Sequence, residues 1–115
     1  MITLRSDMMI NHLEKEKILN LSTEVPYQEN KIVSKTISNN EGLVMTLLSF
    51  DGEQEISTHS APGDALVIAL DGEADITIDG KLHYIKKGES IIMPANVPHA
   101  VNVKTRYQML LIVSK

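Results

Sequence analysis

The chain has 115 residues, no cysteine and a net charge of −4. This length fits one domain, and the lack of cysteine excludes a disulfide scaffold, a thiolate zinc site and a cysteine nucleophile. The basic residues are scattered and no apolar run approaches the ~20 residues that span a bilayer, so we expect neither nucleic-acid binding nor a membrane span. The N-terminal residues lack the apolar stretch of a signal peptide, which predicts a cytosolic protein.

The first 30 residues differ from the rest of the chain. Helical spacing is roughly kept by Ile10, Leu13, Lys17 or Ile18, and Leu21, which predicts a short helix within residues 9–21. Pro26 ends this pattern, because the residue before a proline is pushed toward extended geometry. We therefore treat residues 1–30 as an N-terminal segment that is partly helical or disordered.

From residue 31 onward, short apolar or alternating runs are separated by turn signals. Asp79-Gly80 is the strongest hairpin signal among them. Strands that recur at such short intervals indicate an all-β sandwich or barrel, and a barrel also removes the exposed edges of the apolar strands. The predicted strands cover residues 31–38, 43–50, 55–61, 65–70, 73–79, 81–86, 90–93, 99–103 and 107–114.

Two stretches have the spacing of a two-part metal-binding motif. The first part of that motif runs glycine, five residues, His-x-His, three or four residues, glutamate, six residues, glycine. In this chain His59 stands at the first histidine of this motif, which is that of the family named below, Ala61 at the second, Ala65 at the glutamate and Gly72 at the closing glycine. The opening glycine, Gly52, comes one residue early.

The second part of the motif runs glycine, five residues, Pro-x-Gly, two residues, histidine, three residues, asparagine. Gly88, Pro94 and His99 match in type and spacing, whereas Asn96 replaces the inner glycine and Val103 replaces the asparagine. Asparagine tolerates a positive φ better than most residues, so the change at Asn96 is mild. In both stretches the chain resembles the small single-domain members of the cupin superfamily.

The resemblance implies an all-β fold, the cupin double-stranded β-helix or jelly-roll barrel, over residues 31–115. It further implies that His59, Ala61, Ala65 and His99 face the barrel lumen. In cupins the complete motif binds one divalent metal ion, so His59 and His99 are candidate metal ligands here. The resemblance also implies a homodimer, and Ile32, Val33 and Ile37 give the first strand apolar residues suited to such an interface.

Two imidazoles fall short of the three protein ligands that a catalytic metal site usually has. A third ligand has to come from outside the motif, and His83 would point away from the lumen if Leu82 points into it. The other candidates for a third ligand are Gln54, Glu55 and Asp64. Three methionines on or beside apolar strands are candidates for pocket lining, since ligand cavities are mostly apolar. They are Met45, Met93 and Met109.

Three functions remain open at this point. The first is a module that binds a small apolar or carboxylated molecule between His59 and His99. The second is a metal-dependent enzyme, a dioxygenase or isomerase with a reduced ligand set. The third is a metal-free isomerase with a histidine as base and Tyr84 or Tyr107 as acid.

Overall fold

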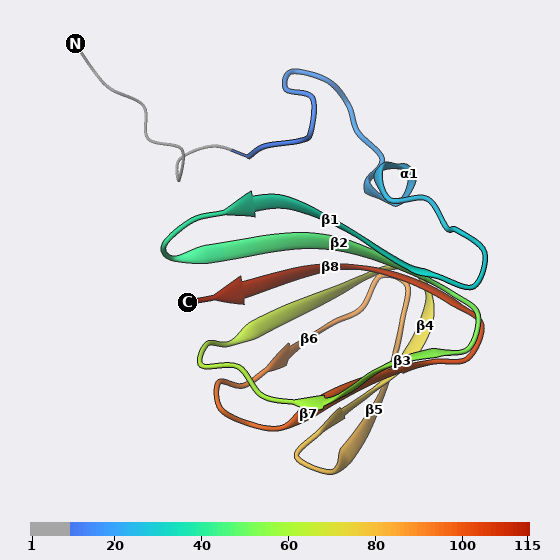
Figure 1. The fold of residues 1–115 in the computed structure, drawn as a ribbon, viewed down its shortest axis with the longest axis vertical. Coiled ribbons are helices and arrows are strands. Elements are labelled where there is room, and N and C mark those ends of the chain that lie inside the picture. Colours follow the sequence, from blue (N-terminus) through green and yellow to red (C-terminus); the bar gives the residue numbers. More distant parts are fainter. Residues whose placement is uncertain (1–9) are drawn as a thin grey trace.

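The computed structural model describes residues 10–115, and these residues form a curled, nearly all-β structure. The strands fold into two facing layers, as Figure 1 shows. The strands are β1 (Ile32–Asn39), β2 (Leu43–Asp51), β3 (Gln54–His59), β4 (Ala65–Ile78), β5 (Lys81–Lys86), β6 (Ser90–Met93), β7 (His99–Val103) and β8 (Arg106–Ser114). Six of the eight strands pair in the order β1-β2-β8-β4-β7-β3, and β5 and β6 each pair with β4. This arrangement confirms the predicted all-β cupin jelly-roll.

β4 belongs to both layers. Its first part pairs with β6 and β8 in the larger sheet, which also contains β1 and β2. Its second part pairs with β5 and β7 in the smaller sheet, which also contains β3. All pairs are antiparallel, and the strand changes sheets where its register with β8 shifts, between Ala69 and Asp71.

The prediction of two separate strands over residues 65–70 and 73–79 is therefore wrong, because Asp71 and Gly72, which lie between these ranges, bend a single strand. Gly72 has a φ of +68°, and a Cβ at this position would overlap the carbonyl oxygen of Arg106 on β8. A glycine at such a corner allows two backbones to approach closely. The Asp79-Gly80 signal, by contrast, is confirmed as the β4–β5 hairpin, and both of its residues have positive φ.

Part of the larger sheet is buried on both faces, and each face has its own apolar cluster. On β8, Tyr107 and Met109 point into the barrel, while Gln108 and Leu110 point to the outer face. The barrel interior contains Phe50, whose ring lies 5.7 Å from that of Tyr107. An alternation between two buried faces explains why β8 reads as a nearly continuous apolar run.

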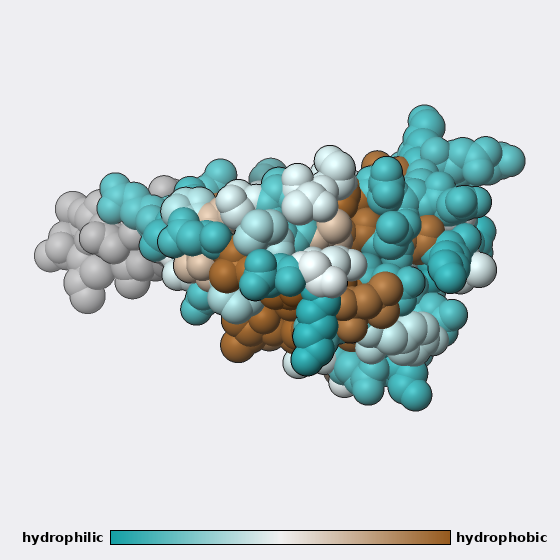
Figure 2. Space-filling model, turned by 90° about the horizontal axis from the view of Figure 1, so that it is seen from below, coloured by the Kyte–Doolittle hydropathy of each residue, from teal (hydrophilic) through white to brown (hydrophobic). Residues whose placement is uncertain are grey.

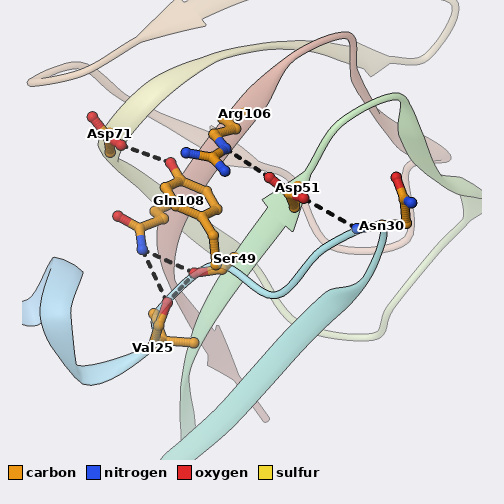
Figure 3. Close-up of polar contacts among 8 residues, drawn as sticks. Val25, Asn30, Ser49, Asp51, Asp71, Arg106 and Gln108 are labelled. Atoms are coloured by element: carbon orange, nitrogen blue, oxygen red, sulfur yellow. Dashed lines mark hydrogen bonds and ion pairs between the residues drawn. The ribbon is translucent and has the colours of Figure 1, made fainter.

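The N-terminal segment covers part of the outer face of the larger sheet. Val25 is buried there, and Leu13 and Leu21 pack against the same cluster. Figure 3 shows Gln108 and Ser49 pointing from the sheet toward the carbonyl oxygen of Val25. Gln108 Nε2 lies 2.9 Å from that oxygen and 2.9 Å from Ser49 Oγ, so polar side chains buried beneath the segment satisfy its backbone.

The helix predicted within residues 9–21 is wrong for the part that the structure describes; Met9 lies outside it. Residues 10–20 are irregular, and α1 is a single turn from Leu21 to Glu24, capped by Asn20. An isolated helix as short as the predicted one is marginal in water, so contact with the sheet decides the conformation of the N-terminal segment. Ile18, which the helical pattern would place on the apolar face of the helix, is 99% exposed. The boundary between the N-terminal segment and the barrel at residue 30 stays a prediction.

Gly72→Ala should destabilise the protein by roughly 2–5 kcal/mol, since left-handed geometry costs ~1–2 and forced overlap another ~1–3. Urea denaturation measures the loss. Gly80→Ala is the matched control, because Gly80 has a φ of +77° but nothing lies within 4 Å of an added Cβ. The control should lose only about 1–2 kcal/mol. Equal losses in the two variants would contradict a special backbone approach at Gly72.

Candidate functional site

The two histidines of the motif meet at one end of the barrel. His59 ends β3 and His99 begins β7, and the two residues are register partners in the smaller sheet. Their Nε2 atoms lie 3.2 Å apart, and the rings are edge-on at 71° with their centroids 4.4 Å apart. His99 is buried, whereas His59 is exposed, so the pair spans the boundary between the barrel interior and solvent.

A backbone carbonyl orients each imidazole. His59 Nδ1 lies 2.9 Å from the carbonyl oxygen of Ser57, and His99 Nδ1 lies 3.2 Å from that of Val97. A carbonyl oxygen can only accept a hydrogen bond, so each Nδ1 acts as the donor in these contacts. The two Nε2 atoms face one another, and both rings line the cavity.

The rim around the histidines is held by backbone contacts between two loops. The amide of Asn96 donates to the carbonyl oxygen of Ala61 at 2.7 Å, and the amide of Ala95 donates to Asp64 Oδ1 at 2.8 Å. Asn96 has a φ of +63°, which agrees with the replacement of glycine by asparagine in the motif. Asp64 is thus a loop anchor whose carboxylate is already engaged.

An apolar cavity of about 110 Å³ lies directly inside the histidine pair. Of the predicted pocket residues, the structure places six around this cavity: His59, Ala61, Ala65, Met93, His99 and Met109. The prediction for Met45 is wrong, because Met45 packs in the outer cluster on the opposite face of the larger sheet. Period-2 alternation accounts for this, since Leu48 on the same strand points inward.

The sequence interpretation missed four apolar residues of the lining. They are Ile56, Val101, Leu111 and Val113. Three of them follow from alternation, because Val101 lies two residues after His99, and Leu111 and Val113 lie two and four after Met109. Ile56 does not follow from alternation, since the register of β3 shifts between Ile56 and His59.

The candidates for a third metal ligand lie outside the lining of the cavity. Leu82 is 59% exposed, so the condition under which His83 would point away from the lumen is not met. His83 is half-buried on the face opposite Leu82, yet it does not line the cavity. Glu55 is exposed, and Gln54 has a buried Oε1 without a hydrogen-bond partner. Across residues 10–115, no three His, Cys, Asp or Glu side chains are grouped to hold a metal ion.

This donor set does not fit a catalytic metal site of three protein ligands, because Ala61 and Ala65 present methyl groups where two ligands are expected. The two tyrosines considered as acids are also remote from the histidines. Tyr84 is 56% exposed and bonds Glu73 on the outer face of the smaller sheet. Tyr107 is fully buried beside Phe50 and does not line the cavity.

Comparison with known proteins gives the family. The model of the cupin domain matches residues 46–114, which is more than half of the chain. The chain therefore belongs to the cupin family. Among residues 10–115 there is no helix with the length and hydrophobicity needed to traverse a bilayer.

Three individual proteins are similar to this chain. A Streptococcus pyogenes protein of unknown function is 42% identical, with a TM-score of 0.89 over 92% of this chain and 93% of that one. A Leptotrichia buccalis cupin 2 conserved barrel domain protein is 50% identical, with a TM-score of 0.82 over 84% of this chain but 47% of that one. A pyrimidine/purine nucleoside phosphorylase of Hydrogenovibrio crunogenus is 33% identical over 69% of this chain and 76% of that protein.

Burial of the His99 side chain, followed by the nearby His59, lowers the pKa of His99. A lowered pKa means that the unfolded chain binds a proton more readily, so stability from neutral His99 is present above about pH 6.5 and is lost as the pH falls below that value. Urea denaturation between about pH 5 and about pH 8 should show this loss, and His99→Gln should reduce the slope. An unchanged slope in the variant would contradict the assignment.

Proposed function

We propose that this cupin binds a small molecule in its barrel, with the cavity enclosing the apolar part and His59 and His99 providing the polar contacts. Two imidazole nitrogens, the Nε2 atoms of His59 and His99, lie 3.2 Å apart at the head of an apolar cavity, and this placement supports the proposal. Ligand sites typically combine an apolar lining with a few convergent polar groups.

The size of the cavity favours a small ligand. Its volume of about 110 Å³ lies well below the roughly 300–1,000 Å³ of pockets for drug-sized molecules. The name of the nucleoside phosphorylase relative offers a nucleoside and phosphate as alternative substrates. The cavity favours neither, because it is small and none of its lining side chains is a lysine or arginine.

The metal-dependent enzyme remains the alternative prediction. Two imidazoles can contribute to a metal site, and their Nδ1 contacts with carbonyls are of the kind that orients metal-binding histidines. We do not favour this function, since the described residues supply no third ligand near the pair.

Ala65→Leu should abolish small-molecule binding by filling the cavity, because Ala65 is buried in its wall. Methyl NMR on Met93 and Met109, both in the lining, detects which fragments from a panel of small neutral and charged molecules enter. Ala100→Leu is the matched control, because Ala100 lies on the face of β7 opposite to His99 and Val101, which line the cavity. This variant should bind fragments as the wild type does. Fragments that bind Ala65→Leu as well as wild type, or no binding fragment at all, would contradict the proposal.

We also propose a homodimer formed through the outer face of the larger sheet. One register row across four strands of this face consists entirely of large apolar residues: Ile92, Leu66, Ile112 and Met45. Ile92 is 58% exposed and its three neighbours are half-buried. On the side of the molecule drawn in Figure 2, apolar side chains gather in one area flanked by hydrophilic ones. Of the first-strand residues, Ile37 is unsuited to the interface because it is buried within its own chain.

Light scattering on a sizing column should give twice the mass of one chain, and Ile92→Lys should shift the protein toward monomer by placing a charge in the apolar row. Leu82→Lys is the matched control, because Leu82 is 59% exposed but lies on the smaller sheet. A wild-type monomer at micromolar concentration, or equal dissociation of both variants, would contradict this interface.

A further inference from the structure

A polar hollow of about 140 Å³ lies on the outer face of the smaller sheet. It is lined by residues of β4, β5 and β7 and by Lys104, which follows β7, and it shares no lining residue with the barrel cavity. Asn102 belongs to this lining, whereas Val101 and Val103 on either side of it are buried in the barrel core. The hollow is therefore separate from the histidine pair, and its own side chains decide what it can bind.

The side chains around the hollow are sorted by hydrogen-bonding type between two adjacent strands. Glu73 and Asp75 lie two residues apart on β4, and their carboxylates offer only acceptors. Asn102 and Lys104 lie two residues apart at the end of β7, and they offer an amide NH₂ and an ammonium group as donors. Asp75 is the register partner of Asn102. An acidic row thus faces a row of donors across one strand spacing, ~4.8 Å.

The opposite charges of the two rows do not neutralise one another. Within residues 10–115, the side chains of Asp75, Asn102 and Lys104 make no hydrogen bond or ion pair. Glu73 is engaged by Tyr84, whose hydroxyl donates to Glu73 Oε2, so that Glu73 Oε1 is left. The groups that could pair across the hollow are therefore available to a molecule that lies between them.

Tyr84 gives the hollow an apolar wall beside the acidic row. It is 56% exposed and is the register partner of Asp75 on β5. Its hydrogen bond to Glu73 fixes the ring over the sheet, and the same bond, followed by desolvation, raises the pKa of the Tyr84 hydroxyl. Because the ring is already held in place, an alkyl group can pack against it with little further loss of side-chain freedom.

We propose that this hollow binds a small zwitterion, a free amino acid with an aliphatic side chain. Its ammonium group lies against Glu73 and Asp75, its carboxylate against Asn102 and Lys104, and its alkyl group against Tyr84. A ligand with a single charge would meet a like charge on one of the two rows, which disfavours it. This site is independent of the function proposed for the barrel.

Chemical-shift titration of the ¹⁵N-labelled protein with L-valine, L-valinamide and N-acetyl-L-valine tests the two charges separately. Valinamide lacks the carboxylate, N-acetylvaline lacks the ammonium group, and all three share the alkyl group. At about pH 6.5, where an α-amino group is protonated, valine should bind with millimolar affinity and at least about twofold more tightly than either derivative. The amide signals of Asp75 and Asn102 should shift, and the methyl signals of Met93 and Met109 in the barrel cavity should not.

Two variants that each remove one charge assign the two rows. Lys104→Gln should reduce the preference for valine over valinamide but keep the preference over N-acetylvaline, and Asp75→Asn should do the reverse. Each should weaken valine binding by about two- to fivefold, the effect of one exposed ion pair. Lys81→Gln and Glu55→Gln are the matched controls, because these exposed residues of β5 and β3 do not line the hollow, and both should bind valine as wild type does.

The outcomes decide the ligand class. Equal affinity for the three compounds overturns the zwitterion, as does tighter binding of valinamide or of N-acetylvaline than of valine. Equal weakening by the matched controls reveals a general charge effect and overturns the site. The absence of a saturable shift at Asp75 and Asn102 with millimolar valine also overturns it. Shifts confined to Met93 and Met109 overturn this site while supporting a ligand in the barrel, so the two proposals fail independently.

Discussion

One strand, β4, runs through both sheets and thereby joins the two layers around a common interior. Because one strand serves both layers, Ala65 at its start and Ile78 at its end are placed in different sheets that face one interior. Ala65 then lines the cavity from the larger sheet, while Ile78 pairs with His99 in the smaller one. The bend requires a residue without a side chain at Gly72, where β8 passes in direct backbone contact.

The N-terminal segment depends on a different kind of interaction. Its apolar residues are few, and its position on the sheet is specified by Gln108, which contacts the carbonyl oxygens of Ser22 and Val25 at 2.9 Å. A buried amide is costly unless its hydrogen bonds are made, so few other placements of the segment are compatible with Gln108. Nearby, Tyr27 donates to Asp71 at 2.6 Å and stacks beneath Arg106, which adds a second attachment.

Sequence patterns predicted the elements that local chemistry decides. Asp79-Gly80 specifies its hairpin because both residues accept positive φ, and the spacing of His59 and His99 within a known motif placed them together. Sequence patterns were insufficient where tertiary contacts decide the local structure. The spacing of apolar residues in the N-terminal segment predicts a helix, but contact with the sheet makes residues 10–20 irregular. The polar and glycine residues at Asp71-Gly72, which separate two predicted strands, are also suited to a bend within one strand. Met45 was misassigned because a strand buried on both faces gives no sign of which face is the lumen.

The register shift between Ile56 and His59 carries a consequence for the histidine pair. In a regular strand, residues three apart lie on opposite faces, so a uniform β3 with Ile56 inward would turn His59 to the outside. The irregularity alone brings that imidazole to the barrel mouth. Loss of this shift in a strand of the same length would leave the hydrophobic interior in place and turn one imidazole of the pair away from the barrel.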